Sequence, residues 1–268
     1  MQHLRGIDPR TEIRDIEERR EKSVRELYGW VLDTEEYKSF VDWENPNSPN
    51  LLWINGQAGT GKTMLSVGLI QELLASNLSG VHDQEIVYFL NQDTEKELNE
   101  GAAVLRALMW LLLVQNPGLA RHLRPSYEES GSALFNDPMA FTSLLPISNK
   151  MANDNELGQV DLLIDALDKC KNAGEDVFRI MKLIPTDGTP AKVKILVTSR
   201  PLLEIDEKMK NISASSKAVI RLDDHSLSGP ITIYIDQKRT LFEGSTGDEN
   251  LVNQTIDRLK GNTGRTFL

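Results

Sequence analysis

Short apolar runs alternate with amphipathic segments along most of the chain. Five runs have the length and composition of strands, at 51–55, 85–90, 161–165, 194–198 and 218–222. The segments between them have helical spacing, most clearly at 62–75, 98–114, 178–184 and 202–209. This alternation predicts an α/β fold, a three-layer sandwich in which a mainly parallel five-stranded sheet carries helices on both faces.

The regions beside these runs are also patterned. Apolar positions between 11 and 42 recur with a rough 3.6-residue period, which predicts an N-terminal amphipathic helix. The Asn- and Pro-rich stretch 45–50 then separates this helix from the first strand. Four prolines lie between the second and third strands, so we expect several shorter helices there: Pro117, Pro125, Pro138 and Pro146.

The charge balance and the single cysteine narrow the class of protein. Acidic residues outnumber basic ones by 40 to 30 in the 268 residues, a net charge of −10 that argues against nucleic acid as a partner. The longest apolar run, 107–114, is far shorter than the roughly 20 residues that cross a bilayer. The N-terminus lacks the apolar stretch of a secretory signal, and Cys170 cannot form an internal disulfide. We therefore expect a soluble cytoplasmic protein with no membrane partner.

The strongest chemical motif is residues 56–63, which match the phosphate-loop (Walker A) pattern GxxxxGK[ST] between an apolar strand and a helix. Glycines let successive backbone N–H groups turn inward around a phosphate, and the helix N-terminus and Lys62 add positive charge. The Thr63 hydroxyl is suited to Mg²⁺. A tight turn without ligand is the alternative for the bare pattern, but its context favours a nucleoside triphosphate. The predicted nucleotide-binding residues are Gly56, Gln57, Ala58, Gly59, Thr60, Gly61, Lys62 and Thr63.

Charged residues follow two later strands. Asp165 ends the third strand, where a carboxylate can hold Mg²⁺ or its water shell, so Thr63 and Asp165 are the predicted metal residues. Asp168 either orients and deprotonates an attacking water or N-caps a helix. Arg200 follows the fourth strand, at the edge where open α/β sheets bind ligands, and either senses the γ-phosphate or is a surface arginine. We take Asp168 and Arg200 as the catalytic candidates.

Several segments together resemble NACHT domains, which are P-loop NTPases of the STAND class. The segments are Leu-Trp-Ile at 52–54, Leu-Ile-Asp-Ala-Leu-Asp at 163–168 and Thr-Ser-Arg-Pro at 198–201. More narrowly, the chain resembles fungal NLR-like NACHT proteins, also described through a nephrocystin-like N-terminal domain. Further segments fit this subgroup, so that the resemblance covers nearly the whole chain: 8–10, 28–32, 103–106 and 133–135.

The resemblance implies more than the motifs alone do. It implies that the strand before Arg200 lies between the phosphate-loop strand and the Asp165 strand. It also implies a switch that exchanges ADP for ATP and associates with itself or with protein partners through flanking regions. The division that follows is a helical lead-in at 1–48, a NACHT core at 49–224 and the helical start of a C-terminal region at 225–268.

Two features of the sequence depart from the family pattern and change the function that we expect. Lys169 stands where the family usually has an acidic residue after Asp168, so we expect nucleotide binding with weak ATP hydrolysis. The chain also stops where helical and winged-helix regions usually follow, which makes it resemble a truncated member. We interpret the chain as a nucleotide-binding switch module of a NACHT-type signalling protein. The alternative is a non-enzymatic decoy that binds a full-length NLR-like partner. A small-molecule kinase is disfavoured because the sequence has neither an arginine-rich lid nor an acceptor pocket.

Overall fold

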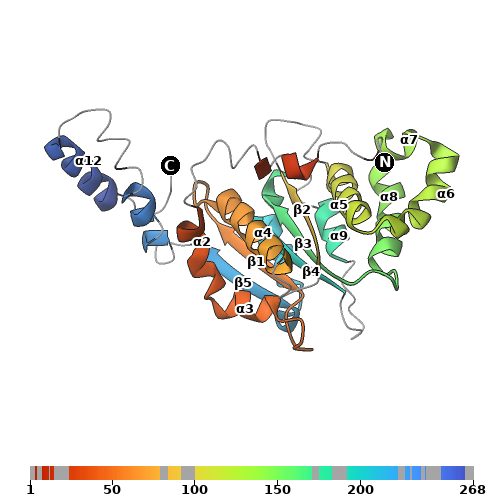
Figure 1. Ribbon diagram of the computed structural model, residues 1–268, viewed down its shortest axis with the longest axis horizontal. Helices are drawn as coiled ribbons and strands as arrows, with labels where there is room; N and C mark the ends of the chain where they lie inside the picture. Colours follow the sequence, from red (N-terminus) through yellow and green to blue (C-terminus); the bar gives the residue numbers. More distant parts are fainter. Residues whose placement is uncertain are drawn as a thin grey trace.

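One parallel sheet forms the centre of the molecule. The computed structural model describes residues 4, 8–11, 13–14, 24–78, 84–91, 100–170, 175–182, 192–222, 227–229, 231–236, 239 and 249–262. Its strands are β1 Leu51–Gly56, β2 Gln84–Leu90, β3 Gln159–Asp165, β4 Val193–Ser199 and β5 Lys217–Leu222. They pair in parallel in the order β2-β3-β4-β1-β5 (Figure 1). The predicted five-stranded sheet is confirmed, and β4 lies between β1 and β3 as the resemblance implies.

Helices cover both faces of this sheet, as predicted. The connection from β1 to β2 runs along the sheet in the opposite direction to the later connections, so right-handed crossovers place its helix on the opposite face. That helix, α4 (Lys62–Leu78), shares its face with α2 (Val24–Leu32) and α3 (Glu35–Val41). The later connections contain α5, α8, α9 and α10, with bounds Gly101–Gln115, Ala140–Ala152, Glu175–Met181 and Leu203–Lys210. A last helix, α12 (Glu249–Asn262), is drawn away from the sheet in Figure 1.

The region between β2 and β3 consists of several short helices, as the prolines predicted. After α5 come η2 (Pro117–Leu119), α6 (Ala120–Ser130), α7 (Ala133–Asn136) and α8, and the last three group at one end of the molecule (Figure 1). Pro117 begins η2 and Pro138 lies between α7 and α8, but Pro125 and Pro146 lie inside helices. The prolines therefore predicted that several helices lie here, but not where each helix ends.

Asp154, just after α8, ties this group of helices together. Its carboxylate accepts hydrogen bonds from Arg121 at 2.6 Å and from His122 at 2.5 Å, both on α6. Lys192, just before β4, donates to the Asp154 main-chain oxygen at 2.8 Å. These contacts hold the α6–α8 group to the end of the sheet away from the phosphate loop.

Among its described residues, the lead-in is divided into α2 and α3 where the sequence predicted one helix over 11–42, and residues 9–11 and 13–14 are helical as well. Residues 12 and 15–23 lie outside the described part, but within it α2 ends at Leu32 and α3 begins at Glu35. Thr34 causes the break, because its hydroxyl donates to Val31 O at 2.7 Å and accepts from the Tyr37 amide at 3.2 Å. Threonine thereby caps the new helix, a role that the 3.6-residue period does not reveal.

A buried lysine attaches the lead-in to the sheet. The side chain of Lys194 on β4 is fully enclosed, and its Nζ donates to Phe40 O at 2.6 Å, Asp42 O at 2.9 Å and Ser48 Oγ at 2.6 Å. The ammonium also lies 4.6 Å from the centroid of the Trp43 ring. Burial lowers the pKa of Lys194 to about 8. The end of the lead-in and the Asn- and Pro-rich stretch that follows it are thus fixed to the amino-terminal end of β4.

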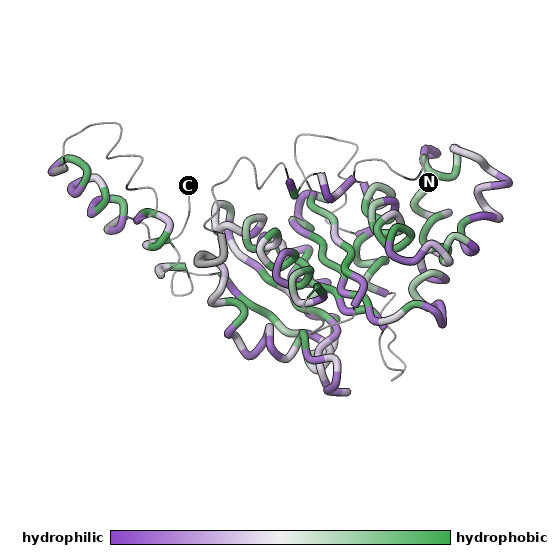
Figure 2. The backbone as a smooth tube through the Cα atoms, viewed as in Figure 1, coloured by the Kyte–Doolittle hydropathy of each residue, from purple (hydrophilic) through white to green (hydrophobic). Residues whose placement is uncertain are grey.

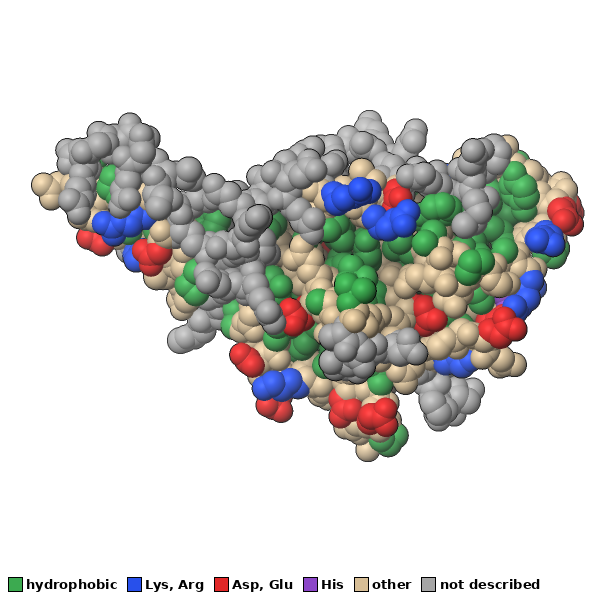
Figure 3. All heavy atoms as spheres, in the orientation of Figure 1, with side chains coloured by type: hydrophobic (Ala, Val, Ile, Leu, Met, Phe, Trp, Pro, Cys, Tyr) green, Lys and Arg blue, Asp and Glu red, His purple; other side chains and the backbone are tan. Residues whose placement is uncertain are grey.

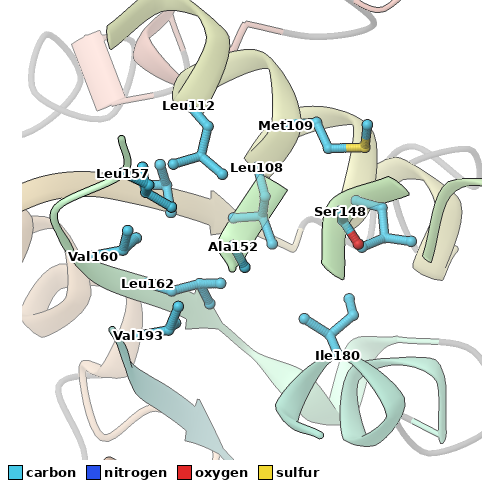
Figure 4. Close-up of a pocket in the computed structure, with 12 residues that line it drawn as sticks. Leu108, Met109, Leu112, Ser148, Ala152, Leu157, Val160, Leu162, Ile180 and Val193 are labelled. Carbon is cyan, nitrogen blue, oxygen red and sulfur yellow. The ribbon is translucent and has the colours of Figure 1, made fainter. Parts of the chain in front are cut away.

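Aliphatic side chains from both helical layers form one continuous core around the strands. Figure 2 shows hydrophobic stretches of backbone in the strands and in the helices beside them. This core includes an apolar cavity of about 30 Å³ between α5, α8, α9 and β3, bordered by Leu108, Met109, Val160 and Ile180 (Figure 4). A water molecule would fit this volume, but an apolar lining keeps such cavities dry.

The outer surface mixes acidic, basic and apolar side chains on the face shown in Figure 3. Within the described ranges, none of the helices has the length and hydropathy needed to span a bilayer.

Candidate functional site

The phosphate loop leaves β1 at the carboxyl edge of the sheet and enters α4. Gly59 and Gly61 have φ values of 78° and 80°, which side-chain-bearing residues rarely adopt. Gly56 is needed for a different reason, because a Cβ there would lie 2.8 Å from both Leu222 Cβ and Thr60 Oγ1. The backbone of the loop therefore depends on the three glycines of the motif.

Lys62 lies across the mouth of this loop. Its Nζ donates to the main-chain oxygens of Gly56 and Gln57, each at 2.7 Å, and the Thr60 hydroxyl donates to the same Gln57 oxygen at 2.9 Å. α4 begins at Lys62 and has no acidic residue in its first turn. The positive end of the helix and the ammonium group thus point to the same place, with no carboxylate of the first turn to offset them.

Three hydroxyl groups surround the carboxylate of Asp165, which is fully buried at the end of β3. Thr63 donates to Oδ2 at 2.8 Å, Ser66 donates to Oδ1 at 2.7 Å, and Thr198 donates to Oδ1 at 2.5 Å. The structure therefore brings together the two predicted metal residues, Thr63 and Asp165. The sequence reasoning missed Ser66, although it lies three residues after Thr63 and so on the same side of α4.

The turn after β3 is held from both neighbouring strands. Ala166 adopts the left-handed conformation, with φ 52° and ψ 54°, and its amide donates to Thr198 Oγ1 at 2.9 Å. The side chain of Asn91, just after β2, donates to Asp165 O at 2.6 Å and accepts from Cys170 Sγ at 3.1 Å. Burial raises the pKa of Cys170 to about 12, so the thiol stays protonated and unreactive.

The two catalytic candidates, Asp168 and Arg200, contact each other. The Arg200 amide donates to Asp168 Oδ1 at 2.9 Å, and Arg200 Nε lies 3.1 Å from Asp168 Oδ2. The Asp168 side chain is 5% exposed and that of Arg200 is 45% exposed. The N-cap alternative for Asp168 is wrong, because Asp168 lies inside η3 (Leu167–Lys169), whose N-cap is Ala166. Arg200 is half-exposed, but it is not an isolated surface residue.

Charges from four other positions act on Lys62. Burial lowers the pKa of Lys62, Asp168 and Asp165 oppose this effect, and Arg200 and Lys169 add to it. Three cationic side chains therefore share the region with two carboxylates, in a chain whose net charge is −10. This local excess of positive charge suits a polyanion.

The donor set also suits Mg²⁺. The hydroxyl of Thr63 and the carboxylate of Asp165 are hard oxygen donors 2.8 Å apart, at the edge of the loop. Magnesium in nucleotide sites is commonly bound by one or two such protein groups together with phosphate oxygens and water. If bound here, the ion would be held by Thr63 and Asp165 and would offset the negative charge of the phosphates.

A cavity of about 490 Å³ borders the loop on the face of the sheet opposite α4. Gly56, Gln57 and Thr60 form one end, and side chains of β1, β5 and α10 form the walls, among them Trp53, Val219 and Lys210. The indole N–H of Trp53 donates to Ser199 Oγ at 2.8 Å, which fixes this wall to β4. The cavity therefore opens beside the phosphate loop and away from Asp165.

Comparison with known sequences identifies relatives. The family model described as nephrocystin 3, N-terminal, matches residues 27–200. The vegetative incompatibility protein HET-E-1 of Podospora anserina is 32% identical over 267 residues, which are 99% of this chain and 19% of HET-E-1. The chain thus spans about a fifth of the length of this curated relative.

Solved structures with a similar fold come from more distant proteins. The Aeropyrum pernix ORC1 protein, solved in complex with DNA, has a TM-score of 0.50 and 13% identity, over 98% of this chain and 58% of that one. The Aeropyrum pernix ORC2 protein, solved as ADPNP-ADP complexes, has a TM-score of 0.47 and 14% identity, over 82% and 52%. At 13% identity the likeness to ORC1 concerns the fold alone.

Proposed function

Because this chain belongs to the nephrocystin 3 N-terminal family, we propose that it is the nucleotide-binding module of a signalling NTPase, with ATP and ADP as ligands. HET-E-1, which is similar over the whole chain, is by its name a vegetative incompatibility protein. By analogy with HET-E-1, we propose that the present chain acts as a nucleotide-dependent switch within a signalling protein.

The observation that carries the proposal is the arrangement around Lys62. A loop with positive φ at Gly59 and Gly61, a helix N-terminus with no acidic residue in its first turn, and an ammonium group converge at the end of β1. The Thr63–Asp165 pair lies at the start of the same helix. Such a set of donors and positive charge favours a chain of phosphates with an associated Mg²⁺.

Each site residue has a proposed role. Residues 56–63 hold the phosphates, and Lys62 leaves its carbonyl partners to contact the β- and γ-phosphates. Asp165 orients Thr63 and the water shell of Mg²⁺, and Arg200 contacts the γ-phosphate. The core at 49–224 carries this site, and the regions 1–48 and 225–268 flank it.

Hydrolysis is proposed to be slow. Lys169 follows Asp168 and contributes positive charge to the site. An attacking water is activated by a group that accepts its proton, and a cation at this position disfavours such activation. A positioned general base typically contributes about 10²–10⁴-fold to a rate, so its weakening leaves binding intact while turnover falls.

Calorimetric titration with Mg-ADP and Mg-ATP tests the proposal. Lys62→Ala removes the ammonium, and we expect it to weaken binding of both nucleotides about a hundredfold or more. Lys150→Ala is the matched control, because it removes the same charge from an exposed site near the end of α8. Equal affinity of the wild type and Lys62→Ala would end the proposal.

The second candidate is the passive decoy module, and the observation that favours it is Lys169. A decoy would bind its partner in the same way with and without nucleotide. Sedimentation and partner capture with Mg-ADP, with Mg-ATP and with neither separate the two functions, since only a switch responds.

A further inference from the structure

The contact between Asp168 and Arg200 gives Asp168 a role other than that of a base. The two residues are 32 positions apart, and their contact joins the turn after β3 to the exit of β4. Both oxygens of the carboxylate are engaged, one by the main chain and the other by the guanidinium. The pair is also shielded on one side, since the Asp168 side chain is 5% exposed.

The two contacts, a hydrogen bond and an ion pair, have separable effects. The bond from the Arg200 amide to Oδ1 holds the main chain at the exit of β4. The ion pair between Nε and Oδ2 holds the guanidinium and neutralises its charge in part. The guanidinium can therefore leave Asp168 while the main-chain bond stays in place, since only side-chain torsions of Arg200 need to change.

We propose that Asp168 is a positioning residue that restrains Arg200, and that the γ-phosphate of a bound triphosphate competes with Asp168 for the Arg200 guanidinium. This inference rests on the proposed function, because it assumes that nucleotide binds at the phosphate loop. A diphosphate has no γ-phosphate and leaves the pair intact. A triphosphate must separate it, so Asp168 shifts the preference of the site toward the diphosphate.

The restraint on Arg200 also connects the nucleotide site to the exposed start of α10. Arg200 O accepts a hydrogen bond from the Leu202 amide at 2.9 Å, and Leu202 is the N-cap residue of α10. The next residue, Leu203, is 79% exposed. Arg200, which in this proposal discriminates between the nucleotides, thus lies just before Leu203, an exposed leucine at the start of α10.

The test is the ratio of the dissociation constants for Mg-ADP and for Mg²⁺ with a non-hydrolysable triphosphate. Asp168→Asn keeps an oxygen that accepts from the Arg200 amide and removes the charge that holds the guanidinium. We expect the ratio to shift about tenfold toward the triphosphate, because the ion pair that competes with the phosphate for the guanidinium is lost. Glu207→Gln, which removes a negative charge from the exposed side of α10, is the control, and we expect its ratio to stay within about twofold of wild type.

The outcomes are distinct. If wild type and Asp168→Asn both bind the two nucleotides with the same ratio, the restraint is refuted and the proposed function stands. If the wild type binds neither nucleotide, the proposed function fails and this inference fails with it. Loss of hydrolysis in Asp168→Asn without any change in the ratio would return Asp168 to the role of a base.

A measurement on the wild type covers the case in which Asp168→Asn does not fold. The Nε–H resonance of Arg200, assigned by its loss in Arg200→Lys, reports the partner of the guanidinium. We expect ADP to leave this resonance in place and the triphosphate analogue to shift it. The same position with both nucleotides would refute the exchange.

Discussion

Thr198 connects the carboxylate of the site to the strained turn beside it, and its replacement by valine is the most informative single change. The side chain is fully buried, donates to Asp165 Oδ1 at 2.5 Å and accepts from the Ala166 amide at 2.9 Å. Valine has nearly the same shape but makes neither contact. The change therefore removes two hydrogen bonds without opening a cavity.

The two contacts determine the expected cost. Hydrogen bonds to charged groups contribute about 1.5–3 kcal/mol, and a buried donor left without a partner costs about 1–3 kcal/mol. Asp165 keeps Thr63 and Ser66 as donors, so its part of the loss falls at the low end. We expect Thr198→Val to lower the free energy of unfolding by about 3 kcal/mol, which corresponds to a fall in Tm of about 6–12 °C for a domain of this size.

Urea and thermal unfolding measure this effect. Thr255→Val is the matched control, because the Thr255 hydroxyl donates only to Leu251 O within α12, and its loss should change stability by less than about 0.5 kcal/mol. A loss of less than about 1 kcal/mol in Thr198→Val would mean that the hydroxyl does not support the turn, and would contradict the account of the Asp165 cluster.

Three further predictions concern other parts of the molecule. Lys169→Glu should raise ATP turnover at least about tenfold in a phosphate-release assay; fast hydrolysis by the wild type, or no gain in the variant, would contradict the role of Lys169. Hydrogen bonds from His122, the Glu156 amide and Arg121 lower the pKa of Asp154 from 3.8 to about 2. The stability that Asp154 contributes is therefore present above about pH 4 and lost as pH falls toward 2, and Asp154→Asn should flatten this part of the unfolding profile; an unchanged profile would argue against it. Val160→Ile adds one methylene beside the apolar cavity in Figure 4 and should stabilise the protein by up to about 0.8 kcal/mol in urea, whereas destabilisation would show that the cavity cannot accept it.

Local sequence patterns predicted the parts of the fold that depend on neighbours in the chain. The strands β1 to β4 were predicted because aliphatic runs buried on both faces contrast with their polar surroundings. The glycines and Lys62 were predicted because the motif follows β1 directly. Thr34 shows the limit of this approach, since a 3.6-residue period continues across a residue whose hydroxyl ends one helix and begins the next.

Contacts between distant segments were harder to predict. Asp168 and Arg200 were both chosen as site residues, but their mutual contact depends on β3 and β4 being neighbours in the sheet. Ser66 and Lys194 were missed because their partners lie far away in the chain, at Asp165 and around Phe40. Such contacts follow from the order of the strands, which the resemblance implied and the residue pattern alone did not.

The central claim is that the corner formed by the phosphate loop, Thr63 and Asp165 holds the phosphates of a nucleotide. Its most direct test is a structure of this chain with Mg²⁺ and a non-hydrolysable ATP analogue. We predict phosphate oxygens within hydrogen-bonding distance of the backbone amides of residues 59–63, Lys62 turned from the main-chain oxygens to the phosphates, and Mg²⁺ beside Thr63 and Asp165. A nucleotide bound elsewhere, or a loop still closed by Lys62 on Gly56 and Gln57 at saturating ligand, would contradict the account.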